Sequence, residues 1–156
     1  MVNTYYEIFD RLETLHSGIK QAIDGLPQEA LDWVPGSEIN SLCVLVIHTA
    51  GAERYWIGDV IGGEISNRVR EEEFHAKGIS AQELNDRLDE ALSHSQSVLE
   101  ALNLNDLEAT RTSPRDSHEY TVVWSLAHAL EHTALHLGHI QIIKQLWDQK
   151  AVSPMA

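Results

Sequence analysis

The sequence has a single cysteine, so no disulfide can form within the chain. Cys43 lies in the apolar run SLCVLVIH, which predicts a buried, unreactive thiol. No stretch approaches the roughly 18 uninterrupted apolar residues of a membrane span. The opening segment MVNTYYEIFDRLETLH lacks the basic and apolar regions of a secretory signal. These absences predict a cytoplasmic protein that does not cross a membrane.

Basic residues are also scarce: 11 Lys and Arg stand against 24 Asp and Glu, giving a formal net charge of −13. A field of this sign repels phosphate backbones and anionic membrane surfaces, so we expect neither nucleic-acid nor membrane binding. It attracts cations, divalent metals included. The length of 156 residues suits one domain with a single core. We predict that domain over residues 1–150, followed by a flexible tail over 151–156.

No segment alternates like a β-strand, whereas four segments carry helical periodicity. We predict helices over 3–24, 40–61, 80–102 and 121–148. Asn3 and Thr121 are predicted N-caps, and Ser80 with Glu83 forms a capping box. The charged segment EISNRVREEEFHAKG between the second and third helices reads as a solvated loop. Four helices of about 20 residues, each about 30 Å long, predict an all-α four-helix bundle.

Four of the nine histidines lie in the last predicted helix: His128, His132, His136 and His139. At about 100° per residue they occupy an arc of about 80°, shared by Leu135 and Ile143, and we expect this stripe to face the bundle. Histidines at positions i and i+4 leave the same face one turn apart and can bind one metal ion. Catalytic metal sites generally use three protein ligands, so a third ligand is needed from a neighbouring helix.

His48 is the candidate third ligand, because it lies in the apolar part of the second helix and a buried imidazole needs a hydrogen-bond partner or a metal. His16 is placed opposite much of its helix's apolar face, and His94 lies in a polar part of the third helix. The sequence HTALH lacks the glutamate of the zincin motif, since Thr133 occupies that place. Residue type and spacing leave two alternatives open, a metal site and a structural polar stripe.

Two segments resemble the DinB/YfiT-like family of metalloenzymes. The segment LDWVPGSEINSLCVLVIHTAGAERYWIGDVIGG is similar to the family's Trp-x-Pro stretch followed by a helix with a central histidine. The segment YTVVWSLAHALEHTALHLGHIQIIKQLW is similar to the family's last helix, with a histidine, then His-x-x-x-His, then Gly and Ile. The chain departs from the family pattern at Leu135, where a histidine is frequent, and at His139, where glutamine is frequent.

The resemblance implies a DinB-like four-helix bundle that holds a divalent metal, zinc or nickel, through His48, His132 and His136. We interpret four further residues as pocket-wall or ligand-orienting groups: His128, His139, Trp56 and Trp124. Members of the family include transferases that use low-molecular-weight thiols and a thiol-dependent isomerase, and membership does not imply DNA binding.

The resemblance therefore implies an enzyme acting on a small-molecule substrate, either as a thiol-dependent S-transferase using an exogenous low-molecular-weight thiol or as a metal-assisted hydrolase. The alternative is a non-catalytic metal-binding or dimerisation bundle, in which the histidine site is structural or vestigial. Bundles of this size often pair through a helical face, so a homodimer is compatible with both hypotheses.

Overall fold

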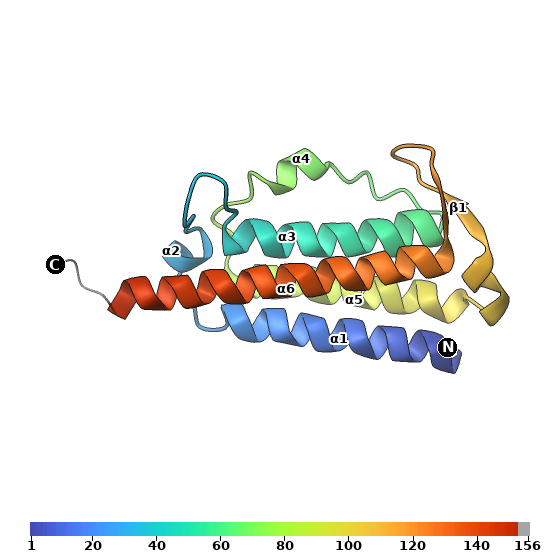
Figure 1. The fold of residues 1–156 in the computed structure, drawn as a ribbon, viewed down its shortest axis with the longest axis horizontal. Coiled ribbons are helices and arrows are strands. Elements are labelled where there is room, and N and C mark those ends of the chain that lie inside the picture. The colour runs from blue at the N-terminus through green and yellow to red at the C-terminus, as the bar shows by residue number, and fades with distance from the viewer. Residues whose placement is uncertain (153–156) are drawn as a thin grey trace.

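The computed structural model describes residues 1–152, which form a four-helix bundle (Figure 1). Its long helices are α1 (Asn3–Ile23), α3 (Leu42–Glu53), α5 (Ala81–Ala101) and α6 (Val122–Val152), and α3 continues into the π-helical η1 (Arg54–Ile61). Both α1 and α3 pack against both α5 and α6, so the order around the bundle is α1, α5, α3, α6. The all-α fold predicted from the sequence is confirmed.

Short elements connect the long helices. Helix α2 (Gln28–Leu31) precedes α3, and α4 (Arg70–Glu73) lies in the connection that returns along the bundle, so that α3 and α5 run parallel (Figure 1). The 3-10 turn η2 (Leu104–Glu108) and an antiparallel hairpin of β1 (Thr110–Thr112) and β2 (Glu119–Thr121) precede α6. The hairpin was not expected, because strands of three residues are too short to show alternation.

The predicted tail over 151–156 begins inside α6, which ends at Val152, and residues 153–156 lie outside the described residues. No helix within residues 1–152 combines the length and apolar character that a bilayer span requires.

Two predicted helix starts are confirmed by their hydrogen bonds. The Ser80 hydroxyl accepts from the backbone N–H of Glu83 at 3.3 Å, and the Glu83 carboxylate accepts from the backbone N–H of Ser80 at 2.9 Å. The Thr121 hydroxyl accepts from the backbone N–H of Trp124 at 3.2 Å. These bonds satisfy backbone donors that the first turn of a helix leaves without an intrahelical partner.

The first helix begins at residue 3 as predicted, but its N-cap differs, and the second long helix begins later than predicted. Asn3 is the first residue of α1 and Val2 occupies the N-cap position, so the prediction of Asn3 as N-cap is wrong. Its amide instead donates to Glu7 at 3.0 Å. Helix α3 begins after Ser41, whose hydroxyl accepts from the backbone N–H of Val44 at 3.2 Å.

Replacing Ser80 by alanine is expected to lower the free energy of unfolding by about 1 kcal/mol, because it removes the capping hydroxyl of α5. Urea unfolding followed by circular dichroism measures the change. Ser97→Ala is the matched control on the same helix, since its exposed hydroxyl bonds only to the carbonyl of Ser93. Equal effects of the two substitutions would contradict a special role for the cap.

The core consists of two apolar clusters separated by a polar layer. One cluster includes Ile19, Leu88 and Ile140, and the other, nearer the hairpin, includes Leu12 and Leu126. Between them each long helix contributes a buried polar residue, exposed by 1% or less: His16, Glu53, Ser95 and Thr133. The expectation that His16 lies opposite the apolar face of its helix is therefore wrong.

Candidate metal centre

Three histidines from two helices meet on the side of the bundle where α3 faces α6. His48 comes from the middle of α3, and His132 and His136 lie one turn apart on α6. Each offers a ring nitrogen, and the three nitrogens lie within 4.8 Å of one another. The Nε2 atoms of His132 and His136 are 3.3 Å apart, and the His48 ring centroid lies 5.0 Å and 5.1 Å from theirs. The structure thus brings together the three residues that the sequence singled out.

This donor set suits a divalent transition metal. Zn–N bonds of about 2.0–2.1 Å in tetrahedral geometry place two nitrogens about 3.3 Å apart, which matches the pair on α6. Burial, and then the neighbouring imidazoles, lower the pKa of His132 to about 3 and that of His136 to about 4. Both rings are therefore neutral at neutral pH, which is the form that binds metal. Their Nδ1 atoms are buried and have no hydrogen-bond partner within residues 1–152.

His48 is held by a carboxylate that sequence reasoning missed. Its Nδ1 lies 2.8 Å from Oε2 of Glu73, which is 8% exposed. Arg68 donates to both oxygens of the same carboxylate, from Nε to Oε1 at 2.5 Å and from Nη2 to Oε2 at 2.8 Å. The prediction that this charged segment is a solvated loop is therefore wrong at both residues. No feature of the run EEEF distinguishes the buried glutamate from the two exposed ones before it.

The charge of Glu73 fixes which nitrogen of His48 is available. Burial would raise the pKa of Glu73, but the hydrogen bonds from Arg68 and His48 outweigh it and hold the pKa below its usual value. An ionised carboxylate can only accept, so the Nδ1 of His48 carries the proton. Its Nε2 then keeps a lone pair for a metal.

Aromatic side chains adjoin the three histidines toward the hairpin end of α6. His128 stacks on Trp124, with ring centroids 4.9 Å apart and an interplanar angle of 10°. Trp56 of η1 packs edge-on against both, at 4.7 Å from His128 and 5.3 Å from Trp124. Trp124 is 44% exposed and His128 lies 5.9 Å from His132, so an aromatic surface leads from solvent to the histidines.

An apolar cavity lies next to His139, on the side of His136 away from the aromatic residues. His139 is exposed, with its ring 5.5 Å from that of His136, and it lines a cavity of about 320 Å³. The other lining residues are mostly aliphatic: Ile39, Leu45, Ile142, Ile143 and Leu146, with Glu38 and Asn40.

The histidine stripe lies toward α3 rather than toward the bundle axis. Leu135, expected within the buried arc, is 55% exposed. The residues of α6 that are buried along this stretch are instead Ala129, Thr133 and Ile140. Ile143, the other aliphatic residue of the arc, is buried at 3% exposure. The expectation that the stripe faces the interior is therefore wrong for Leu135 and confirmed for Ile143, and the half-buried histidines lie at the edge of the bundle.

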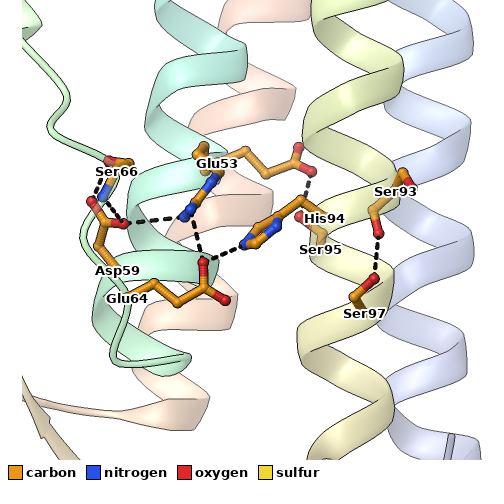
Figure 2. Close-up of polar contacts among 9 residues, drawn as sticks. Glu53, Asp59, Glu64, Ser66, Ser93, His94, Ser95 and Ser97 are labelled. Carbon is orange, nitrogen blue, oxygen red and sulfur yellow. Dashed lines mark hydrogen bonds and ion pairs between the residues drawn. The ribbon is translucent and has the colours of Figure 1, made fainter.

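A larger cavity, of about 710 Å³, lies on the α5 side of α3, and none of the three histidines lines it. Several of its charged lining residues are paired: Arg54 donates to Asp59 at 3.1 Å and to Glu64 at 2.7 Å, and Arg68 donates to Glu73. Nε2 of His94 lies 3.0 Å from Oε2 of Glu64, and Figure 2 shows this contact between α5 and the segment after η1. The three histidines, whose ring nitrogens lie within 4.8 Å of one another, are the stronger candidate for a functional site.

The fold and the site define a class of protein: a four-helix bundle in which one histidine of the second long helix meets two histidines of the last helix. Residues 7–149 match the family described as mycothiol-S-transferase, so the chain belongs to that family. The resemblance to DinB/YfiT-like proteins is confirmed with it.

The fold is shared by a solved structure. The crystal structure of a conserved protein from Enterococcus faecalis matches with a TM-score of 0.75 and 16% identity, over 94% of this chain and 98% of that one. At this identity the likeness concerns the fold alone. No curated protein matches the sequence.

Proposed function

We propose that the protein is a metal-dependent thiol S-transferase, in which His48, His132 and His136 hold a divalent ion, zinc or nickel. Its reaction joins an exogenous low-molecular-weight thiol to a small electrophilic substrate. One observation carries the proposal: three imidazoles converge at the surface of a bundle whose sequence belongs to the mycothiol-S-transferase family.

The reaction balances without a further co-reactant. When bound, a divalent ion held by three neutral ligands keeps its full charge and lowers the pKa of a thiol that reaches it. The thiol sulfur forms a bond to the electrophilic carbon, the bond from that carbon to its leaving group breaks, and the leaving group takes the bonding electrons. The thiol proton is released to solvent.

The residues on both sides of the histidines fit a reaction with two substrates. The aromatic surface of Trp56, Trp124 and His128 offers a flat, partly exposed face. The cavity beside His139 is lined mainly by aliphatic side chains. Two adjoining surfaces of different chemistry support a thiol and an electrophile bound side by side.

One further observation favours thiol transfer over hydrolysis, and a second shows where the thiol must come from. Within residues 1–152, Glu73 is the carboxylate hydrogen-bonded to the histidine cluster, and its oxygens are engaged by His48 and Arg68. It is therefore not free to take a proton from an attacking water. Cys43 is fully buried, and burial raises the pKa of its thiol, so the nucleophilic sulfur must come from outside the chain.

Zinc- or nickel-loaded protein is expected to accelerate thioether formation between monochlorobimane and at least one thiol among mycothiol, glutathione, coenzyme A and cysteine. Fluorescence of the product gives the rate, which should saturate in the thiol. His136→Ala is expected to abolish the acceleration, whereas His118→Ala, on the exposed hairpin loop, should leave it unchanged. Stoichiometric metal without acceleration by any of these thiols would favour the non-catalytic bundle.

A further inference from the structure

The contact between α4 and α3 brings Arg68 and Glu73 against the helix that carries His48. We infer that Glu73 is a positioning residue that fixes His48 as the third metal ligand. Arg68 donates to both oxygens of its carboxylate, which packs against the backbone of Gly51. The inference rests on the metal site of the proposed function, and it adds three residues to that site from outside the histidine motif.

Gly51 makes room for the carboxylate. It lies one turn after His48, and a Cβ at this position would overlap Oε1 of Glu73 and come within 3.1 Å of Nε of Arg68. Glycine inside a helix weakens it relative to alanine, and α3 has no break at this residue. The Arg68–Glu73 pair fills the space that a side chain at this position would occupy. This explains why glycine suits the position better than alanine.

Arg68 holds the carboxylate in one orientation. Its two donors reach the two oxygens of Glu73, and the side chains of this pair are only 11% and 9% exposed. A bidentate pair of this kind fixes geometry as well as charge. The neighbouring Glu71 and Glu72 are exposed, so the burial is specific to the one glutamate that contacts His48.

The arrangement matters because His48 is the one histidine that α3 contributes to the cluster. A carboxylate on Nδ1 fixes the ring and its tautomer and makes the other nitrogen more basic, and losing such a partner typically weakens metal binding about 10- to 100-fold. His132 and His136 are supported by their shared helix, whereas His48 depends on this contact for its direction.

The test is the apparent dissociation constant for Zn²⁺ of the full chain, from competition with a chromogenic chelator. Glu73→Gln is expected to weaken binding about tenfold, and Glu73→Ala up to about 100-fold. Gly51→Ala should weaken it in the same direction, because the new methyl group displaces the carboxylate. Alanine is the stronger helix former, so this variant is expected to fold.

Glu72→Gln and Glu72→Ala are the matched controls, since they remove the same charge from an exposed position of the same helix. They should change the constant less than twofold. The visible absorption of bound Co²⁺ provides a second readout, and it should change in the Glu73 and Gly51 variants but not in the controls. Zinc affinity and cobalt spectra that are unchanged in Glu73→Ala overturn the inference while leaving the metal site intact. A wild-type protein that binds neither metal overturns both.

Discussion

Replacing His132 by alanine is expected to weaken zinc and nickel binding roughly 100- to 1000-fold. Zinc sites with four protein ligands bind with about 10–16 kcal/mol, which is about 2.5–4 kcal/mol for each ligand. In the proposed site His132 would share the ion with the other two histidines, since its Nε2 lies 3.3 Å from that of His136. Two remaining imidazoles on different helices would hold a divalent ion far less well.

Elemental analysis of purified, tag-free protein after dialysis against dilute metal measures this change. We expect near-stoichiometric zinc or nickel in the wild type and none in His132→Ala. His118→Ala is the control, because its ring lies on the exposed loop of the hairpin and is not among the three converging residues. Equal metal content in wild type and His132→Ala would mean that the histidine stripe is structural.

The same substitution is expected to make the metal-free protein less sensitive to acid. Burial and the neighbouring rings hold the pKa of His132 at about 3, below its value near 6.5 in an unfolded chain. Between these values the unfolded state binds the proton and the folded state does not, so stability is lost as the pH falls through this window. Alanine has no proton to bind, and the unfolding midpoint of His132→Ala should therefore fall less than that of the wild type between pH 7 and pH 4.

The three histidines could be predicted from the sequence because two local signals describe them. Spacing on one helix places His132 and His136 on the same face, and the apolar run around His48 indicates burial. The resemblance to a known family selects the same residues. Ser80 and Glu83 were predictable for a similar reason, since a capping box is complete within four residues.

The residues that surround the histidines could not be predicted, because their roles depend on contacts between distant segments. Arg68 and Glu73 read as solvent-facing charges until the connection after η1 brings them onto α3. His16 reads as a polar interruption of α1, and only its partner Glu53, 37 residues away, explains its burial. The order of helices around the bundle is likewise set by how the helices pack against one another. The periodicity of a single helix does not predict its neighbours.

Replacing Glu53 by alanine is expected to lower the free energy of unfolding by roughly 2–6 kcal/mol, because each of the two buried groups left without its partner, on His16 and Ser95, costs about 1–3 kcal/mol. Oε2 of Glu53 lies 2.6 Å from Nε2 of His16, and Oε1 accepts from the hydroxyl of Ser95 at 2.7 Å (Figure 2 shows this second contact). All three residues are exposed by 1% or less, so the groups that lose their partner lie away from bulk solvent. Globular domains of this size are stable by about 5–15 kcal/mol, which makes this loss a large fraction of the total.

Chemical denaturation at constant pH measures the loss, with Glu90→Ala as the control. Glu90 contacts Arg87 at 3.3 Å, but both side chains are more than 60% exposed, and an exposed pair of this kind contributes about 0–1 kcal/mol. A loss below 1 kcal/mol in Glu53→Ala, no larger than in the control, would show that the polar layer does not hold the bundle together.

The triple replacement His16→Leu, Glu53→Met, Ser95→Ala separates two explanations of that loss. If the damage comes from polar groups left buried without partners, an apolar layer of similar volume should recover most of the stability, to within about 1–2 kcal/mol of the wild type. If the damage comes from the lost interaction itself, the triple variant should remain as unstable as the single one. We expect the recovery, because the polar layer lies between two apolar clusters that an apolar layer would join into one core. The contribution of the layer would then be to fix how the four helices pair, and the triple variant should show it as a broader, less cooperative unfolding transition.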